Sequence, residues 1–209
     1  KNLQSAQSKM ADSVERLSSG LRINRAKDDA AGLGVANALT QQINTSDQGI
    51  RNLNDGISIV QTAEGALSQV SEMAQRILSL SVQATSGSLS STQHASVIAE
   101  MKTLVTGITN IQTRTKFSGT TLFASTAINV FNGKESTDKV EITAAALATI
   151  GSASGSALTL SSWINTETAI TSSTYYQSIA TSASLYITAL DTQRGLLGAI
   201  QNQMEYSVN

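Results

Sequence analysis

Between residues 43 and 84, apolar side chains return at alternating steps of three and four residues, and no proline interrupts them. Ile43, Ile50 and Ile57 recur every seven residues. Between and beyond them lie Leu53, Val60, Leu67 and Ala74. This spacing puts the apolar groups on one face of an α-helix. A helix of about forty residues, roughly 60 Å long at 1.5 Å per residue, cannot bury that face by itself. We therefore expect other helices to lie alongside it.

The apolar line also changes phase along this helix. Glu64 and Ser71 occupy positions where the repeat would require apolar residues. The line is continued instead by Val70, Ile77 and Ala84. An apolar stripe that drifts around the helix predicts that different parts of the helix face different partner helices.

A third helix of about 25 residues is expected after Ser90, because Ser90 and Gln93 have the spacing of a capping box. Its apolar residues follow at three- and four-residue steps: Val97, Ile98, Met101, Leu104, Val105, Ile108 and Ile111. The loop at residues 87–90 is short, so this helix should return antiparallel to the preceding one.

A fourth apolar stripe follows Ser172 and continues to the end of the chain. Its members are Tyr176, Ile179, Ala183, Ile187, Leu190, Leu197, Ile200, Met204 and Val208. Near the start of the chain, residues 1 to about 20 show another helical pattern, in which Gly20 offers a break; its members are Leu3, Met10, Val14, Leu17 and Leu21. Residues 20–34 then read as a bent connector, in which Asp28 or Asp29 could cap a following turn.

Residues 128–130 and 140–142 alternate apolar with polar side chains around Asn132-Gly133, which indicates a small β-hairpin. We place it at the end of the bundle away from the chain termini. The predicted fold class is mainly α: an elongated antiparallel helical bundle of long helices with a small β-hairpin region at one end.

The expected domains are a truncated terminal helix and connector at 1–30 and a helical rod domain at 31–209. The rod domain would carry a hairpin and loop insert at 124–160. Lys1 is not an initiator Met, and the last helical pattern runs to Asn209. We therefore expect a chain trimmed at both ends.

The charge pattern excludes several partners. Charged residues make up 14% of the chain, the net charge is −1, and the two signs are interspersed. This argues against a nucleic-acid interface and against a basic membrane-binding patch. No run of eighteen apolar residues and no signal-peptide pattern is present. We expect no nucleic-acid partner, no membrane insertion and no cleaved signal peptide.

Residues typical of catalysis are few. The chain has no cysteine and a single histidine, His94, which we expect at the surface or as a capping residue near a helix start. Asp28-Asp29 is the only adjacent acidic pair, and it needs no role beyond a helix start. These residues support no enzyme activity, no metal site and no cofactor.

Four separate motifs, in this order, resemble bacterial flagellin. They are RLSSGLRINRAKDDAAGLGVANAL at 16–39, RNLNDGISIVQTAEGALSQV at 51–70, TRTKFSGTTLF at 113–123 and RGLLGAIQNQ at 194–203. The resemblance implies a structural subunit that self-assembles with identical copies into the flagellar filament for motility. It also implies an extracellular location, at the flagellum or cell surface, reached without a cleaved signal peptide.

The resemblance further implies a segment read by the toll-like flagellin receptor of animal hosts, here QRILSLSV at 75–82 with a glutamate on the next helix. The matching residues are Gln75, Arg76, Leu80 and Glu100. Leu78 and Ser79 depart from the family pattern, which usually has an Arg-Glu pair there. The alternative is that Leu80 continues the helix seam and Arg76 is simply solvated.

A second function stays open. Trp163, Tyr175 and Tyr176 form the one aromatic concentration, within a Ser/Thr-rich stretch. Exposed aromatic rings could stack on sugars, which would make the chain a cell-surface flagellin-family adhesin or polysaccharide-binding receptor. The same rings could instead seal the bundle end against the hairpin.

Overall fold

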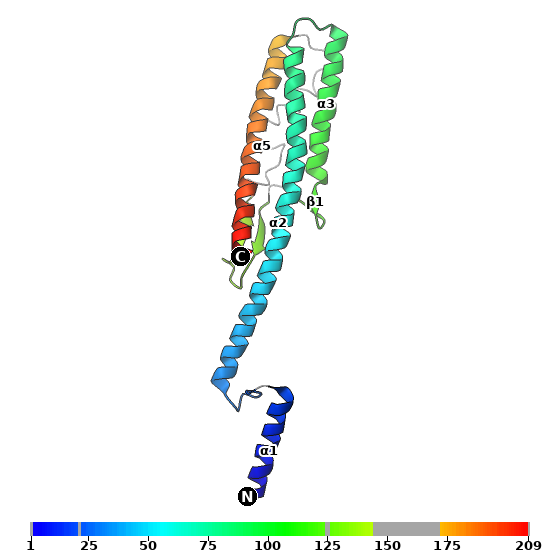
Figure 1. Ribbon diagram of the computed structural model, residues 1–209. Coiled ribbons are helices and arrows are strands. Elements are labelled where there is room, and N and C mark those ends of the chain that lie inside the picture. Colours follow the sequence, from blue (N-terminus) through cyan, green and yellow to red (C-terminus); the bar gives the residue numbers. More distant parts are fainter. Residues whose placement is uncertain (1, 21, 124–125, 144–171, 209) are drawn as a thin grey trace. The chain divides into compact units, whose positions relative to one another are not determined.

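The computed structural model describes residues 2–20, 22–123, 126–143 and 172–208 (Figure 1). The helices are α1 (Asn2–Ser19), α2 (Ala30–Ala84), α3 (Ser91–Arg114) and α5 (Ser173–Val208). The strands are β1 (Lys116–Phe117), β2 (Thr120–Thr121), β3 (Ile128–Phe131) and β4 (Lys139–Ile142). The chain divides into two compact units, Lys1–Gln48 and Gly49–Asn209, which we describe separately. The predicted domain division after residue 30 stays a prediction.

The second unit is a bundle in which α3 and α5 both run antiparallel to α2 (Figure 1). All three helices contribute to one apolar core. Its fully buried centre includes Val60, Leu67 and Val70 of α2, Met101 of α3, and Ala183, Leu197 and Met204 of α5. The predicted fold class, mainly α with long antiparallel helices and a small hairpin region at one end, is confirmed.

The phase drift along α2 is visible in its burial. Leu53, Val60 and Leu67 are buried near the start of the bundle, and Ile77 and Ala84 are buried farther along, as predicted. Ser71 is buried at one of the irregular positions. At the other, Glu64 lies 3.8 Å from Nη2 of Arg194 on α5. The drift therefore lets α2 contact two helices whose positions around it differ.

Two of the isoleucines that define the repeat do not belong to the core. Ile43 is 60% exposed and Ile50 is 39% exposed. Ile43 lies in the first unit, in which no described residue is buried. The expectation that neighbouring helices cover the stripe from Ile43 onward is therefore wrong for these two residues. The periodicity is correct, but it does not tell which members of the stripe are buried.

The helix ends follow the predicted capping chemistry. Ser90 Oγ accepts a hydrogen bond from the Gln93 amide, and Gln93 Oε1 accepts one from the Ser90 amide at 2.7 Å, completing the capping box of α3. Asp29 Oδ1 accepts a 2.8 Å bond from the amide of Gly32, in the first turn of α2. Gly20 has φ of 68° directly after α1 and so ends that helix in the left-handed region.

Two short antiparallel hairpins follow α3. Ser118 and Gly119, both with positive φ, form the tight turn between β1 and β2. In the second hairpin, Ile128 pairs with Ile142 and Val130 with Val140, which confirms the predicted strands. Alternation places Val130, Val140 and Ile142 in the core, while Phe131 is exposed.

The second hairpin packs near the first bundle residues of α2 and the last turns of α5. Asn52 Nδ2 on α2 donates a 2.8 Å hydrogen bond to the Phe131 carbonyl. A Cβ atom at Gly56 would lie 2.8 Å from Met204 Sδ and 2.9 Å from Val130 Cγ2. The hairpin is thus at the end of the bundle where α5 finishes, so its predicted position away from the termini was wrong. The reason is chain direction, because α3 returns antiparallel to α2 and delivers the chain to this end.

Candidate functional site

The predicted receptor segment brings two charged side chains together across α2 and α3. Arg76 Nε donates to Glu100 Oε1 at 2.8 Å, and Arg76 Nη2 lies 2.7 Å from the same oxygen. Both side chains are about half exposed. Gln75, also exposed, makes a long 3.5 Å contact from Nε2 to Ser71 Oγ. These three residues form a polar surface that a partner could contact.

Leu80 is in a different environment. It is 2% exposed and belongs to the core, one helical turn beyond Arg76. Ser79 is exposed, and Leu78 is half-buried against the core. Leu80 can therefore influence this surface only by supporting the helix beneath it. A receptor role for the four predicted residues stays a prediction.

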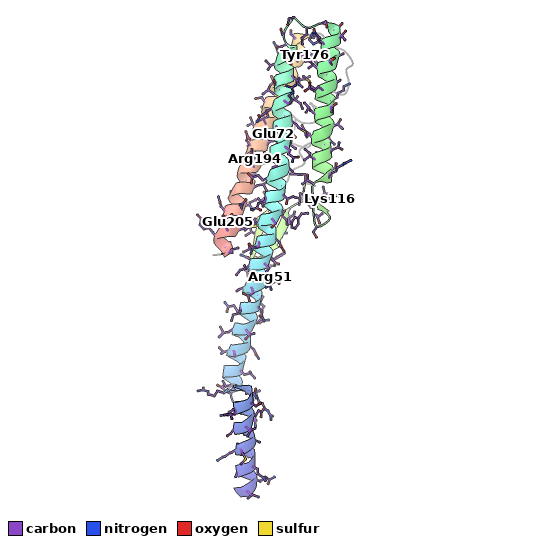
Figure 2. All side chains as sticks on the ribbon, turned by 45° about the vertical axis from the view of Figure 1, so that its right-hand side comes forward. Arg51, Glu72, Lys116, Tyr176, Arg194 and Glu205 are labelled. Atoms are coloured by element: carbon purple, nitrogen blue, oxygen red, sulfur yellow. The ribbon has the colours of Figure 1, made fainter. Side chains whose placement is uncertain are left out.

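Tyr176 lies at the end of the bundle where α5 begins (Figure 2), and its ring stacks on that of His94, near the start of α3. Their ring centroids are 5.2 Å apart with an interplanar angle of 17°. Both side chains are buried, so the expectation of a surface or capping histidine was wrong. The physical reason is tertiary: α5 supplies an aromatic partner that the sequence near His94 does not reveal. Burial also raises the pKa of the Tyr176 hydroxyl.

Tyr175 is half-buried and meets the Tyr176 ring edge-on, with centroids 5.4 Å apart. Trp163 lies outside the described residues. Tyr176 is at the end of the bundle where α5 begins (Figure 2), whereas the second hairpin packs near Met204, where α5 ends. The idea that these aromatics seal the bundle against the hairpin was therefore wrong for Tyr176. Sugar stacking by the three aromatics stays a prediction.

Charge is distributed unevenly along the bundle. The segments 77–99 and 172–190 contain no Asp, Glu, Lys or Arg. The charged pairs Arg76–Glu100 and Glu64–Arg194 lie on the middle of the bundle. Burial raises the pKa of Tyr186, whose hydroxyl oxygen has no hydrogen-bond partner among the described residues. Among the described residues, no three His, Cys, Asp or Glu side chains gather as metal ligands.

Apolar side chains are exposed along the helices of the first unit. On α1, Leu3, Met10, Val14 and Leu17 are 61% to 90% exposed. On α2, Val35, Leu39 and Ile43 are also exposed. Each set lies on one helical face, because its members are three, four or seven residues apart. Contiguous exposed apolar faces mark sites of protein association.

Sequence reasoning missed part of this surface. Val35 and Leu39 continue the four-residue spacing upstream of Ile43, and that spacing was the signal for a longer helix. The sequence reasoning also missed the close approach of the second hairpin to Gly49 and Gly56. The signal that could have indicated this contact was the pair of glycines seven residues apart on one helix face. No described helix is long and apolar enough to cross a bilayer.

Comparison with known sequences gives one consistent result. The sequence family described as the bacterial flagellin N-terminal helical region matches residues 1–127. Flagellin of Escherichia coli K12 is 46% identical over 123 residues, which cover 59% of this chain and 25% of that protein. Flagellin 1 of Proteus mirabilis is 42% identical over 141 residues, which cover 68% of this chain and 36% of that protein. Phase 1 flagellin of Salmonella naestved is 48% identical over 118 residues, which cover 56% of this chain and 23% of that protein.

The matched segments therefore span only 23% to 36% of these curated relatives. Among solved structures, the crystal structure of Bacillus cereus flagellin is similar, with a TM-score of 0.63 and 22% identity. That similarity covers 77% of this chain and 88% of the other. At this identity the structural match concerns the fold alone.

Proposed function

The chain belongs to the family of the bacterial flagellin N-terminal helical region, and we propose that it is part of a structural subunit that self-assembles into the flagellar filament for motility. The subunit would have identical copies as partners and no catalytic role. It would lie outside the cell, in the flagellum, after export without a cleaved signal peptide.

The observation that carries this proposal is the exposed apolar face of α1 and of the first part of α2. Side chains such as Leu17 and Leu39 contribute to no core within the described residues. Burying a Val, Leu or Ile side chain is worth about 1.5–3 kcal/mol, so covering such a face favours association strongly. Contacts between identical subunits that do not close into a ring produce an open helical filament.

Replacing Val35, Leu39 and Ile43 together by serine is expected to reduce filament formation by about tenfold or more. The three side chains are exposed on one face of α2, so their loss should not disturb the bundle core. Filaments of the complete gene product would be counted by electron microscopy and motility measured in soft agar.

The matched control replaces Asn37, Thr40 and Asn44 by serine, because these three side chains are exposed on the same stretch of α2 but are polar. It should assemble like the native protein. The thermal unfolding of both variants, followed by circular dichroism, should match the native protein. Normal filaments from the apolar triple variant would contradict the proposal.

We also propose that the surface formed by Gln75, Arg76 and Glu100 is recognised by the toll-like flagellin receptor of animal hosts. The support is the match of these residues to the family pattern and the half-exposed ion pair between α2 and α3. Arginine is frequent among the residues that dominate interface energies, because its guanidinium binds through several donors.

Arg76→Ala is expected to lower the response of reporter cells carrying that receptor by about tenfold. The matched control is Arg114→Ala on α3, because Arg114 makes no ion pair within the described part of the chain. The control should respond like the native protein. An unchanged response to the Arg76 variant would remove the support for this partner. Leu80→Ala is a poor test, since Leu80 is buried and its loss would weaken the core.

The polysaccharide-binding alternative has less support. Of its three aromatic residues, Tyr176 is buried against His94 and offers no free ring face to a sugar. Tyr175 is half-buried beside it, and Trp163 is outside the described residues. The filament role is therefore preferred.

A further inference from the structure

We propose that α1 is held to the connector at residues 22–29 by a salt-sensitive ionic latch, which takes the place of an apolar core in the first unit. The latch consists of Asp12, Glu15 and Arg16 on α1 and of Arg25, Lys27 and Asp28 on the connector. It does not depend on the filament role, because it concerns the folding of one chain.

The central contact of the latch is a two-pronged ion pair. Arg25 Nε donates to Glu15 Oε1 at 2.8 Å, and Arg25 Nη2 lies 2.8 Å from Glu15 Oε2. Asn24 Nδ2 donates a further bond to Glu15 Oε1 at 3.1 Å. Paired N–H donors on a carboxylate give both strength and a defined orientation. Glu15 thereby sets the angle between α1 and the chain that leaves it.

Two more pairs reinforce this contact. Lys27 Nζ lies 2.9 Å from Asp12 Oδ1, and Arg16 Nη2 lies 3.8 Å from Asp28 Oδ1. Asp28 Oδ2 also accepts a hydrogen bond from the backbone amide of Arg25, and this bond closes a turn within the connector. The Lys27 hydrogen bond and charge lower the pKa of Asp12, so this carboxylate stays ionised to a lower pH than an ordinary aspartate. The pairing is lost only as the pH falls through that lowered value.

The described residues of the first unit form no apolar core that could stabilise α1 in addition to these contacts. None of the described residues of the first unit is buried, and the apolar face of α1 is exposed. Most of the stability of a protein helix comes from packing of its apolar face, and this contribution is missing for α1 within its unit. The ion pairs and the Asn24 bond connect α1 to the connector without any buried apolar contact.

Salt should therefore act differently on the two units. The screening length falls from about 10 Å at 0.1 M ionic strength to about 3 Å at 1 M, so exposed ion pairs weaken. The bundle of the second unit rests on buried apolar side chains, which salt does not screen. High salt is expected to release α1 while the bundle stays folded.

The test is amide hydrogen exchange, followed by mass spectrometry on the full chain at neutral pH. In the native chain, raising NaCl from 0.05 M to 1 M should speed exchange in residues 9–19 by about threefold to tenfold. Exchange in residues 97–108 of α3 should stay unchanged. At low salt, Glu15→Arg and Arg25→Glu should each produce a similar acceleration in residues 9–19.

The double variant, carrying Glu15→Arg together with Arg25→Glu, reverses the pair and should restore exchange to within about twofold of native. Arg22→Glu makes the same charge change in the same connector at a residue outside the latch, and it should have no effect. The proposal is overturned if salt leaves α1 exchange unchanged, if the reversed pair fails to restore protection, or if residues 9–19 of the native chain exchange like an unstructured peptide.

Discussion

Replacing Leu67 by alanine is expected to lower the free energy of unfolding of the helical bundle by about 2–5 kcal/mol. Leu67 is 0% exposed and is among the largest fully buried side chains of the core. Its removal would leave a cavity where α2 meets its partner helices. Alanine has the highest helix propensity, so the loss cannot come from the helix itself. Urea unfolding followed by circular dichroism at 222 nm would measure it.

The control is Leu185→Ala, the same substitution on α5 at a residue that is 55% exposed. It should change the unfolding free energy by no more than about 0.5 kcal/mol. If both variants lost the same amount, Leu67 would not occupy the packed centre of the bundle, and the arrangement of α2 against α3 and α5 would be wrong.

Replacing Gly49 by alanine is expected to destabilise the packing of the second hairpin against α2 by up to about 2 kcal/mol. A Cβ atom at Gly49 would clash with the Asn132 carbonyl oxygen and lie 2.8 Å from the carbonyl carbon. Both are backbone atoms, so no side-chain rotation can relieve the clash. Overpacking costs about 1–3 kcal/mol and occasionally more, against a gain of about 1 kcal/mol from alanine in a helix.

Gly65→Ala is the matched control on the same helix, because no atom from another described element lies within 4 Å of its missing Cβ. It should stabilise the bundle by up to about 1 kcal/mol. Amide exchange of the β3–β4 hairpin should accelerate in the Gly49 variant and stay unchanged in the Gly65 variant. Effects of the same sign at the two glycines would rule out the close approach of hairpin and helix.

Much of the bundle could be predicted because its signals are local. The steps of three and four residues that place Val60 and Leu67 on one helical face arise from the geometry of a single helix. The capping box at Ser90 and Gln93 depends on two residues three positions apart. The alternation of Val140 and Ile142 with polar neighbours follows from strand geometry. Each of these expectations is confirmed by burial or hydrogen bonding.

Burial of individual residues was less predictable. Ile43 and Val60 belong to the same repeat, yet Ile43 is exposed and Val60 is buried. The repeat shows that a face is apolar but not where a neighbouring helix begins or ends. His94 was expected at the surface because its sequence neighbours offer no partner, and it is buried because Tyr176 comes from another helix.

The sequence by itself determined that this chain forms long helices with apolar faces, where α3 begins, and that a small hairpin follows it. Its motifs also pointed to the flagellin family, which the match over residues 1–127 shows. Only the tertiary structure decided which apolar faces are covered, at which end of the bundle the hairpin packs, and which charges meet, as Glu15 does with Arg25. The first group of properties comes from interactions within a few residues, whereas the second depends on which distant segments lie side by side.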